Sequence, residues 1–308
     1  MKILIPVGCR SDDGLSSPVI KRLSDKHIPT TVLNLDPGRY IQSYCITEAH
    51  IIGDSRPDIA LIFGDRIEMT AAAAACFNNN VPIAHVYAGV NNNIATLDDI
   101  NRHAITAWSD IQFCESKKAA EKVYDLLSTI GKDTNIYVVG ITHLDDLEIS
   151  EDAVPDVPYD LVLYNPITYG KDLKQKTRDG MITISGFVNC AEGYTLGRHT
   201  VFIIPNPDAG REHILEFHSV MKKTAAGAAG MYSWHPDLPR PLFLGLLKNC
   251  ERFITNSSAA IYEAPHFLEP RQIIQIGDRN RGRDSGPFKI GASDRIVEVL
   301  KKWSGEYA

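Results

Sequence analysis

Two serines and a glutamate in the last quarter of the chain have the types and spacing to bind a nucleotide. The strand-like residues 253–255 precede Asn256-Ser257-Ser258, and an alanine-rich segment containing Glu263 follows. This order predicts a buried strand, a polar turn and the beginning of a helix. Backbone N–H groups at a helix N-terminus and two hydroxyl groups suit a phosphate or diphosphate, and the glutamate could reach a ribose diol. The competing interpretation is a capped helix with a surface glutamate.

Charged and polar residues also follow predicted strands in the first half of the chain. Arg10 follows the strand predicted over 2–7, where its fixed charge could pair with a phosphate. Asp65 and Tyr87 stand at the ends of two later strands. Because the carboxyl ends of parallel strands meet at one edge of a sheet, we expect Asp65 and Tyr87 to lie near each other.

A further acidic position lies at the beginning of a predicted helix. Residues 96–106 are typical of a helix capped by Thr96, with Asp98 and Asp99 in its first turn. These acids could take part in chemistry, and they could equally serve only to complement the helix dipole. Both interpretations stay open on this motif alone.

The elements that must position these residues alternate between strands and helices. Predicted strands cover 2–7, 30–35, 58–63, 81–89, 110–114 and 135–140, and then 159–164, 200–204, 253–255 and 272–276. Repeated strand–helix units predict an α/β fold with parallel sheets whose functional loops lie at one edge.

An acidic segment divides this alternation into two halves. Residues 148–158 contain two prolines, which is typical of a linker. We therefore predict an N-terminal domain over 1–147, the linker 148–158, a C-terminal domain over 159–290 and a closing helix over 291–308. A chain of 308 residues is long enough for two hydrophobic cores.

The composition excludes several classes of protein. A net charge of -6 argues against a general nucleic-acid coat, and no run approaches the ~20 apolar residues of a membrane span. The N-terminus enters a predicted strand at once, which leaves no room for a signal peptide. The six cysteines show no CxxC spacing, so we predict neither a metal site nor a disulfide framework. A cytoplasmic protein is the expectation.

Several motifs, taken in their order along the chain, resemble the UDP-N-acetylglucosamine 2-epimerase family, particularly its hydrolysing branch. The matching segments are Gly8-Cys9-Arg10, Gly64-Asp65-Arg66-Ile67-Glu68, residues 96–106, Asn165-Pro166-Ile167-Thr168, residues 205–210, Asn256-Ser257-Ser258 with Glu263-Ala264-Pro265, and residues 277–283. Together they cover most of the chain. The resemblance implies two Rossmann-like domains with the ligand in a central cleft, the glycosyltransferase-B architecture, and makes a homodimer a reasonable expectation.

The resemblance also implies roles for individual residues. Those that would hold the nucleotide are Arg10, Ser257 and Ser258 on the diphosphate, Glu263 on the ribose, and Arg279 and Arg283 as added positive charge. Asp65 matches an acid beside the sugar, and Asp99 matches a carboxylate that the family uses in proton transfer. No cofactor or metal is implied, because the UDP-sugar is itself the substrate.

Two departures from the family pattern change what the site could do. Tyr87 stands where the family has a glutamate in a His-[Ile/Val]-Glu-[Gly/Ala]-Gly pattern, and Asn165 stands where it has a histidine. Tyrosine, with an ordinary pKa of about 10, is a poor base at neutral pH, and an amide does not exchange protons usefully. Both changes keep hydrogen bonding and lose proton transfer. The catalytic candidates are therefore Asp65, Asp99, Tyr87 and Asn165.

We accordingly expect a metal-independent glycosyltransferase that uses a UDP-sugar. Its hydroxyl acceptor, whether a saccharide, a lipid-linked sugar or a modified nucleobase, is unidentified. Asp65, Asp99 or Asp13 would act as the base, with His85 and His103 as alternatives. Two other hypotheses stay open: a UDP-N-acetylglucosamine 2-epimerase, in which the catalytic candidates still move protons, and a non-catalytic nucleotide-sugar binding protein.

Overall fold

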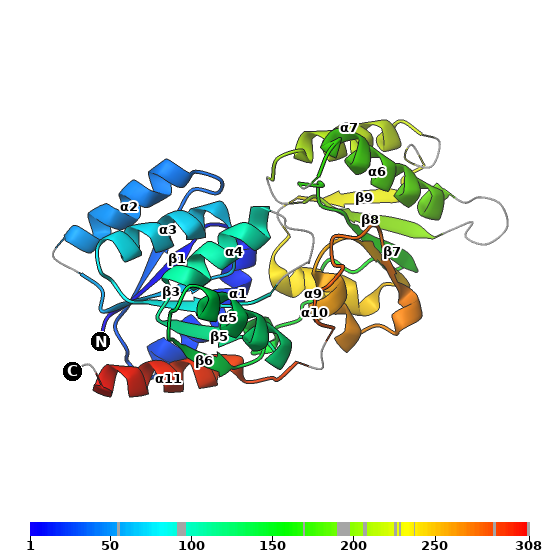
Figure 1. Ribbon diagram of the computed structural model, residues 1–308. Helices are drawn as coiled ribbons and strands as arrows, with labels where there is room; N and C mark the ends of the chain where they lie inside the picture. The colour runs from blue at the N-terminus through cyan, green and yellow to red at the C-terminus, as the bar shows by residue number, and fades with distance from the viewer. Residues whose placement is uncertain are drawn as a thin grey trace. The chain divides into compact units, whose positions relative to one another are not determined.

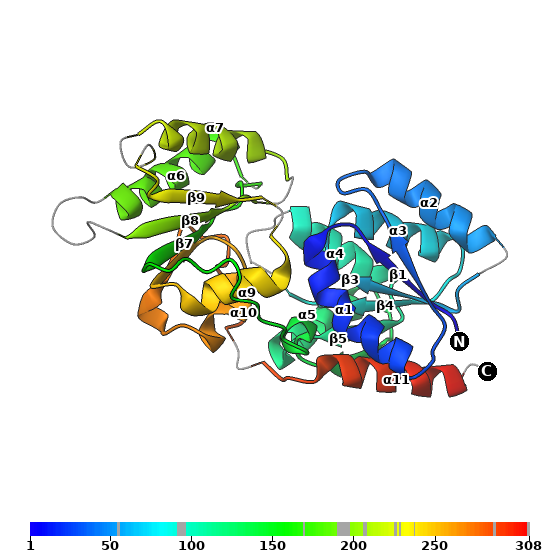
Figure 2. The same cartoon turned by 180° about the vertical axis from the view of Figure 1, so that it is seen from behind.

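The computed structural model describes residues 1–53, 56–90, 97–168, 170–189, 198–205, 208–224, 227, 229–236, 238–285 and 288–306. The chain divides into two compact units, which Figures 1 and 2 show from opposite sides. One unit spans Met1–Leu147 together with Arg283–Ala308, and the other spans Glu148–Gly282. Each is built on its own parallel sheet.

The described part of the first unit contains a six-stranded sheet in the order β2-β1-β3-β4-β5-β6. Its strands are β1 Ile3–Val7, β2 Thr30–Asn34, β3 Ile59–Phe63, β4 Ile83–Val86, β5 Ile111–Cys114 and β6 Asn135–Val138. The helices are α1 Arg10–Asp25, α2 Tyr40–Ile52, α3 Ile67–Asn78, α4 Leu97–Trp108, α5 Lys117–Thr129, η1 Thr142–Leu144 and α11 Ala292–Glu306. Strands β1, β3, β4 and β5 are buried along their whole length, which explains their nearly continuous apolar sequences.

Two features of the sequence set the packing of helices in this unit. Helix α3 carries a run of buried alanines, and these small side chains let α2 approach closely. Helix α11 lies beside α1 in both views (Figures 1 and 2), and Arg22 of α1 pairs with Asp294 of α11 at 2.9 Å. The end of the chain therefore returns to the unit that contains its beginning.

The described part of the second unit contains a five-stranded sheet in the order β11-β10-β7-β8-β9. Its strands are β7 Tyr159–Leu163, β8 His199–Ile203, β9 Tyr232–His235, β10 Arg252–Thr255 and β11 Ile273–Gln275. The helices are α6 Leu173–Asn189, α7 Arg211–Lys222, α9 Arg240–Asn249, α10 Ala259–Tyr262, η2 Ala264–His266 and η3 Pro270–Gln272. Helices α6 and α7 cover one face of the sheet, and α9 and α10 cover the other (Figure 1).

The acidic segment 148–158 packs against α9 within the second unit. The Ser150 N–H donates to the Pro241 carbonyl at 3.0 Å, and Glu151 pairs with Lys248 at 3.0 Å. A Cβ at Gly245 would lie 1.9 Å from the Ser150 carbonyl oxygen, so only glycine permits this close approach. The segment therefore fixes the position of α9, including its first turn.

The prediction of an α/β fold with two parallel sheets is confirmed. The structure differs from the sequence-based expectation in four details. The segment 148–158, predicted as a linker, belongs to the second unit. Residues 283–290 group with the first unit, whereas we had placed them in the C-terminal domain. Strand β9 was not predicted, because it is an edge strand of mixed polarity. The helix after Ser258 is a single turn, because Pro265 has no N–H to extend it.

Candidate functional site

A buried arginine from α4 joins the carboxyl ends of β3 and β4 in the first unit. Arg102 Nη1 donates to the Tyr87 carbonyl oxygen at 2.6 Å, and Arg102 Nη2 forms an ion pair with the Asp65 carboxylate. Charge-assisted hydrogen bonds of this kind are strong and orient the carboxylate. Asp65 and Tyr87 therefore lie at the same edge of the sheet, as their positions after parallel strands predict.

Asp99 lies on the same helix as Arg102, one turn earlier, and is buried. Burial lowers the pKa of the neighbouring His103, and the negative charge of Asp99 opposes this effect. Asp98 is only half-buried, and Asp13, the remaining acidic candidate, is exposed on α1. The structure thus distinguishes Asp99 from the other two acids by its burial and by its place beside His103.

Two further buried acids, which sequence analysis did not select, lie where β1 ends. Asp12 Oδ2 accepts hydrogen bonds from the Gly8 and Cys9 N–H groups, both at 3.0 Å. Glu68 Oε1 accepts from Arg66 Nε at 2.7 Å, and Oε2 accepts from the Gly38 N–H at 3.0 Å. Burial raises the pKa of Asp12 to about 6. A buried acid gives no signal in sequence that separates it from a surface one.

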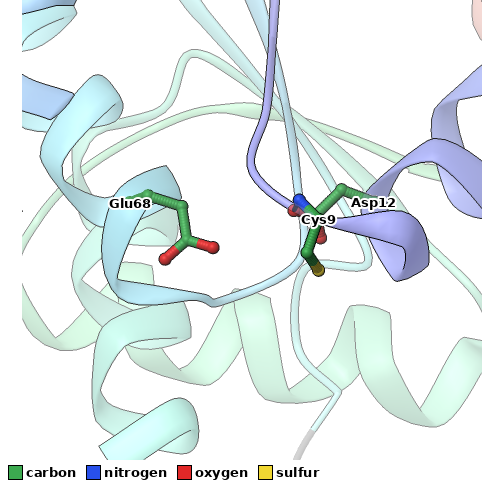
Figure 3. A group of neighbouring side chains, drawn as sticks. All are labelled: Cys9, Asp12 and Glu68. Carbon is green, nitrogen blue, oxygen red and sulfur yellow. Dashed lines mark hydrogen bonds between the residues drawn. The ribbon is translucent and has the colours of Figure 1, made fainter. Parts of the chain in front are cut away.

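Cys9, Asp12 and Glu68 also bring possible metal ligands together. Figure 3 shows Cys9 and Asp12 at the beginning of α1 and Glu68 on α3, and their ligand atoms lie within 4.8 Å of one another. Oxygens of both carboxylates already accept hydrogen bonds from N–H groups. We therefore interpret this cluster as the scaffold that shapes the loop after β1. A Cβ at Gly8 would lie 2.5 Å from Glu68 Cγ, so this packing depends on glycine.

The Tyr87 side chain points into the first unit. Its hydroxyl lies 2.9 Å from Thr142 Oγ1 and 2.9 Å from His143 Nδ1, and it accepts from the Thr142 N–H at 2.9 Å. Burial raises the pKa of Tyr87 far above the neutral range. The φ angle of Tyr87 is +67°, an uncommon backbone conformation for a bulky residue. This placement favours a structural role, in which Tyr87 anchors the loop after β4 to η1.

The two histidine alternatives differ in their surroundings. His85 lies on β4 without exposed surface, with Nε2 2.8 Å from the Gly64 carbonyl oxygen and Nδ1 3.1 Å from Thr106 Oγ1. Burial lowers the pKa of His85 to about 3, so its imidazole is neutral and held in place. His103 is half-buried on α4, beside Asp99. Of the two, only His103 has exposed surface for contact with a ligand.

In the second unit, the strand ends are joined by amide groups. Asn256, after β10, accepts from the Asn165 N–H at 2.7 Å and donates to the Asn165 carbonyl oxygen at 2.8 Å. Asn280, after β11, donates to the Ser257 carbonyl oxygen at 2.9 Å. These contacts tie the loops after β7, β10 and β11 together. Asn165, Ser257 and the loop of Arg279 therefore lie at one edge of this sheet.

The turn that we selected for phosphate binding is well satisfied by its own groups. The Ser257 N–H donates to Thr255 Oγ1 at 2.9 Å, and Ser257 Oγ accepts from the Ala259 N–H at 3.3 Å. Ser258 precedes α10, whose single turn supplies much less helix dipole than the longer helix that we expected. The hydroxyl groups of Ser257 and Ser258, rather than a helix dipole, are therefore the main groups that this turn offers for hydrogen bonding to a ligand.

The remaining residues selected for nucleotide binding have different environments. Glu263 is buried, and its Oε1 pairs with Arg240 Nη1 at 3.3 Å. Arg279 Nη1 donates to the Pro166 carbonyl oxygen at 3.2 Å. Arg283 is the first residue of the segment that returns to the first unit. Arg10 begins α1, and its side chain lies outside the described part of the structure.

Comparison with solved structures defines the class of protein. A Staphylococcus aureus MnaA–UDP structure superposes with a TM-score of 0.75 at 18% identity, over 99% of this chain and 97% of that chain. A Methanocaldococcus jannaschii UDP-GlcNAc 2-epimerase in complex with UDP-GlcNAc and UDP gives a TM-score of 0.73 at 19% identity, over 98% of this chain and 100% of that chain. At this level of identity the likeness establishes the two-domain Rossmann-like fold.

Sequence comparison identifies the family. The family model described as UDP-N-acetylglucosamine 2-epimerase matches residues 34–306, and the chain therefore belongs to this family. A Legionella pneumophila protein named UDP-N,N'-diacetylbacillosamine 2-epimerase (hydrolyzing) is 25% identical over 97% of this chain and 85% of its own length. The Campylobacter jejuni GDP/UDP-N,N'-diacetylbacillosamine 2-epimerase (hydrolyzing) is 27% identical over 75% of this chain, which spans 59% of that relative.

These relatives correct one prediction and confirm two. Both are named as 2-epimerases, so the sequence-based preference for glycosyl transfer was wrong, and its alternative, epimerisation, is the better supported. The resemblance to the 2-epimerase family and the prediction of an enzyme are confirmed. In the part of the chain that the structure describes, the helices are too short or too polar to cross a bilayer.

Proposed function

We propose that this chain is a UDP-sugar 2-epimerase, which inverts C2 of a UDP-activated 2-acetamido sugar. The observation that carries this proposal is the match of the 2-epimerase family model to residues 34–306. Relatives named as hydrolysing 2-epimerases of diacetylbacillosamine point to UDP-linked N,N'-diacetylbacillosamine as one substrate to test beside UDP-N-acetylglucosamine.

The proposed reaction requires a base and a good leaving group. A carboxylate removes the proton from C2, the electrons of the C2–H bond form a C1–C2 double bond, and the C1–O bond breaks to release UDP. A proton then returns to the opposite face of C2, and either water or UDP adds at C1. Water gives the free epimer and UDP, whereas UDP gives the epimerised UDP-sugar. No oxidant or reductant is involved.

We assign proton transfer to Asp99 and Asp65. Asp99 is buried next to His103, and the ion pair with Arg102 orients the Asp65 carboxylate. Positioned acids and bases of this kind each contribute ~10²–10⁴-fold to a rate. The buried network of Tyr87 supports a structural role for that residue in the proposed mechanism.

In this proposal the second unit supplies most of the residues that bind the nucleotide. In this unit we assign the diphosphate to Ser257 and Ser258, the ribose to Glu263 and added positive charge to Arg279. The family resemblance also assigns Arg10 to the diphosphate and Arg283 as added charge, and both of these residues belong to the first unit. The exchange of hydrogen bonds between Asn165 and Asn256 supports this assignment, because it holds the loop beside Ser257 rigidly. In this proposal Asn165 contributes to ligand binding and does not transfer protons. The UDP-sugar is the only small molecule required.

Deuterium exchange tests the reaction. The protein is incubated in deuterated water with UDP-N-acetylglucosamine or with UDP-N,N'-diacetylbacillosamine, and the products are examined by NMR and mass spectrometry. We expect deuterium at C2 of the product, with UDP released if the enzyme hydrolyses. Measurable UDP-sugar binding without deuterium incorporation from either substrate would refute the proposal.

Two further expectations accompany this proposal. The family resemblance favours a homodimer, which light scattering of the purified chain tests directly. We also propose a cytoplasmic location, which fractionation of the source cells tests. A monomer in the first experiment or secretion in the second would contradict the corresponding expectation without affecting the proposed chemistry.

A further inference from the structure

An ion pair in the second unit links two elements that follow different strands. Arg240 is the first residue of α9, which follows β9, and Glu263 ends α10, which follows β10. Strands β9 and β10 are separated in the sheet by β7 and β8. The side chains of Arg240 and Glu263 nevertheless meet, with Arg240 Nη1 3.3 Å from Glu263 Oε1. The contact therefore spans the carboxyl edge of the sheet.

The position of Arg240 is fixed on both sides. Pro239 caps α9, and Pro241 follows Arg240 in its first turn. The Pro241 carbonyl accepts from the Ser150 N–H at 3.0 Å, which ties this turn to the segment 148–158. The backbone of Arg240 is therefore held in place before any ligand binds.

The Glu263 carboxylate is buried, and Arg240 is its ion-pair partner. Its side chain exposes 11% of its surface, whereas that of Arg240 exposes 31%. Burial raises the pKa of Glu263, and the charge and hydrogen bond of Arg240 oppose this effect. Arg240 Nη1 contacts Oε1 at 3.3 Å, and an ionised carboxylate has about four lone-pair sites for hydrogen bonds. A carboxylate held in this way can still accept a hydrogen bond from a hydroxyl group.

We propose that Arg240 is a positioning residue of the nucleotide site, which holds Glu263 ionised and oriented to accept hydrogen bonds from the ribose hydroxyls. This inference rests on the proposed function for the role of Glu263 as the ribose contact. It adds that Arg240 makes the site selective for ribonucleotides over 2'-deoxyribonucleotides. A neutral or displaced carboxyl group would accept the 2'-hydroxyl poorly and would lose this selectivity.

The test compares two ligands and several variants by isothermal titration calorimetry. UDP and 2'-deoxy-UDP are titrated into the wild-type chain, Arg240→Gln, Arg240→Lys and Glu263→Gln. We expect Arg240→Gln and Glu263→Gln to weaken UDP binding about tenfold or more and to change 2'-deoxy-UDP binding much less. Arg240→Lys should restore part of the selectivity, because a lysine keeps the positive charge.

The chain offers a closely matched control. Arg198 Nη1 pairs with Asp160 Oδ1 at 3.2 Å, with a side chain 28% exposed, in the same unit. Asp160 lies at the beginning of β7 and Arg198 just before β8, so this pair is at the amino edge of the sheet. Arg198→Gln should leave the ratio of the two affinities unchanged. Because Asp160 also pairs with Arg252 at 2.5 Å, this variant reports the effect of losing one arginine–carboxylate contact in this unit.

The outcomes separate this inference from the proposed function. If Arg240→Gln weakens the binding of UDP and 2'-deoxy-UDP equally, or changes neither affinity, the positioning role is wrong. This holds even when the wild type exchanges deuterium at C2. If Arg240→Gln fails to fold, Glu263→Gln and Arg240→Lys decide, and unchanged selectivity in both refutes the inference. If selectivity changes as expected while the wild type exchanges no deuterium at C2, the epimerase proposal fails and the ribose contact stands.

Discussion

The carboxyl edges of the two sheets carry different chemistry. At the first edge an acid and an arginine contact each other in the pair of Asp65 with Arg102. At the second edge, the exchange of amide hydrogen bonds between Asn165 and Asn256 lies beside an ion pair, that of Glu263 with Arg240. Acids can accept and return protons, whereas amides hold a ligand without exchanging protons. The difference suggests that the first unit performs the proton transfer and the second binds the nucleotide.

The largest expected effect comes from an acid at the first edge. Asp99→Asn keeps the size of the side chain and removes its ability to act as a base. We expect C2 deuterium exchange to fall by ~10²–10⁴-fold, with little change in UDP affinity. Single-turnover exchange and calorimetry measure the two quantities. Asp98→Asn, at the half-buried neighbouring position, is the control, and equal losses in both variants would contradict the role of Asp99.

The next test concerns the pH dependence of stability at the first edge. Burial raises the pKa of Asp12 from 3.8 to about 6. Between these two pH values the folded chain binds a proton that the unfolded chain has released. The free energy of unfolding therefore falls as the pH rises from 3.8 to about 6. In the wild type we expect the free energy of unfolding to fall by on the order of 2 kcal/mol between pH ~4 and ~7. Asp12→Asn should not show this fall.

Urea unfolding at several pH values measures this difference. Asparagine keeps an oxygen that can accept from the Gly8 and Cys9 N–H groups, so the variant should fold. The exposed neighbour provides the control. Burial raises the pKa of Asp13 as well, but its side chain is exposed, so Asp13→Asn should retain most of the dependence of the wild type. Identical pH profiles for Asp12→Asn and the wild type would show that Asp12 titrates normally.

A smaller effect is expected at the second edge. Asn256→Ala removes both hydrogen bonds to Asn165 and should lower the free energy of unfolding by about 2 kcal/mol. Because these groups hold the nucleotide loop, KM for the UDP-sugar should rise while kcat changes little. Asn249→Ala, an exposed amide at the other end of α9, should leave KM unchanged. A fall in kcat with constant KM would place proton transfer in the second unit.

The smallest effect is expected at Tyr87. Tyr87→Phe removes the hydroxyl that accepts from the Thr142 N–H, and the free energy of unfolding should fall by about 1 kcal/mol. Since Tyr87 is assigned a structural role, C2 exchange should fall less than tenfold, far below the ~10²–10⁴-fold expected of a proton donor. Thermal unfolding and the exchange assay measure both effects. A hundredfold loss of exchange in a stable variant would make Tyr87 catalytic.

The fold could be predicted because its main signals are local. The buried strands β1 and β3 are continuous apolar runs, and each is followed by glycine and polar residues that end the strand. Strand β9 escaped prediction because it is only four residues long, Tyr232–His235, and lies at an edge of the sheet. The length of α10 was overestimated because alanine favours a helix locally, although Pro265 stops it.

The sequence by itself determined which residues stand at the strand ends, since strand order and side-chain type are written along the chain. Asp65 was selected in this way, Asp99 and Glu263 by their places in predicted helical segments, and Asn165 by its place in a family motif. Only the tertiary structure decided which partners these residues have. Asp65 pairs with Arg102, 37 positions away, and Glu263 pairs with Arg240, 23 positions away. Burial and long-range packing set such pairs and the protonation states that follow from them, and neither property can be deduced from local sequence.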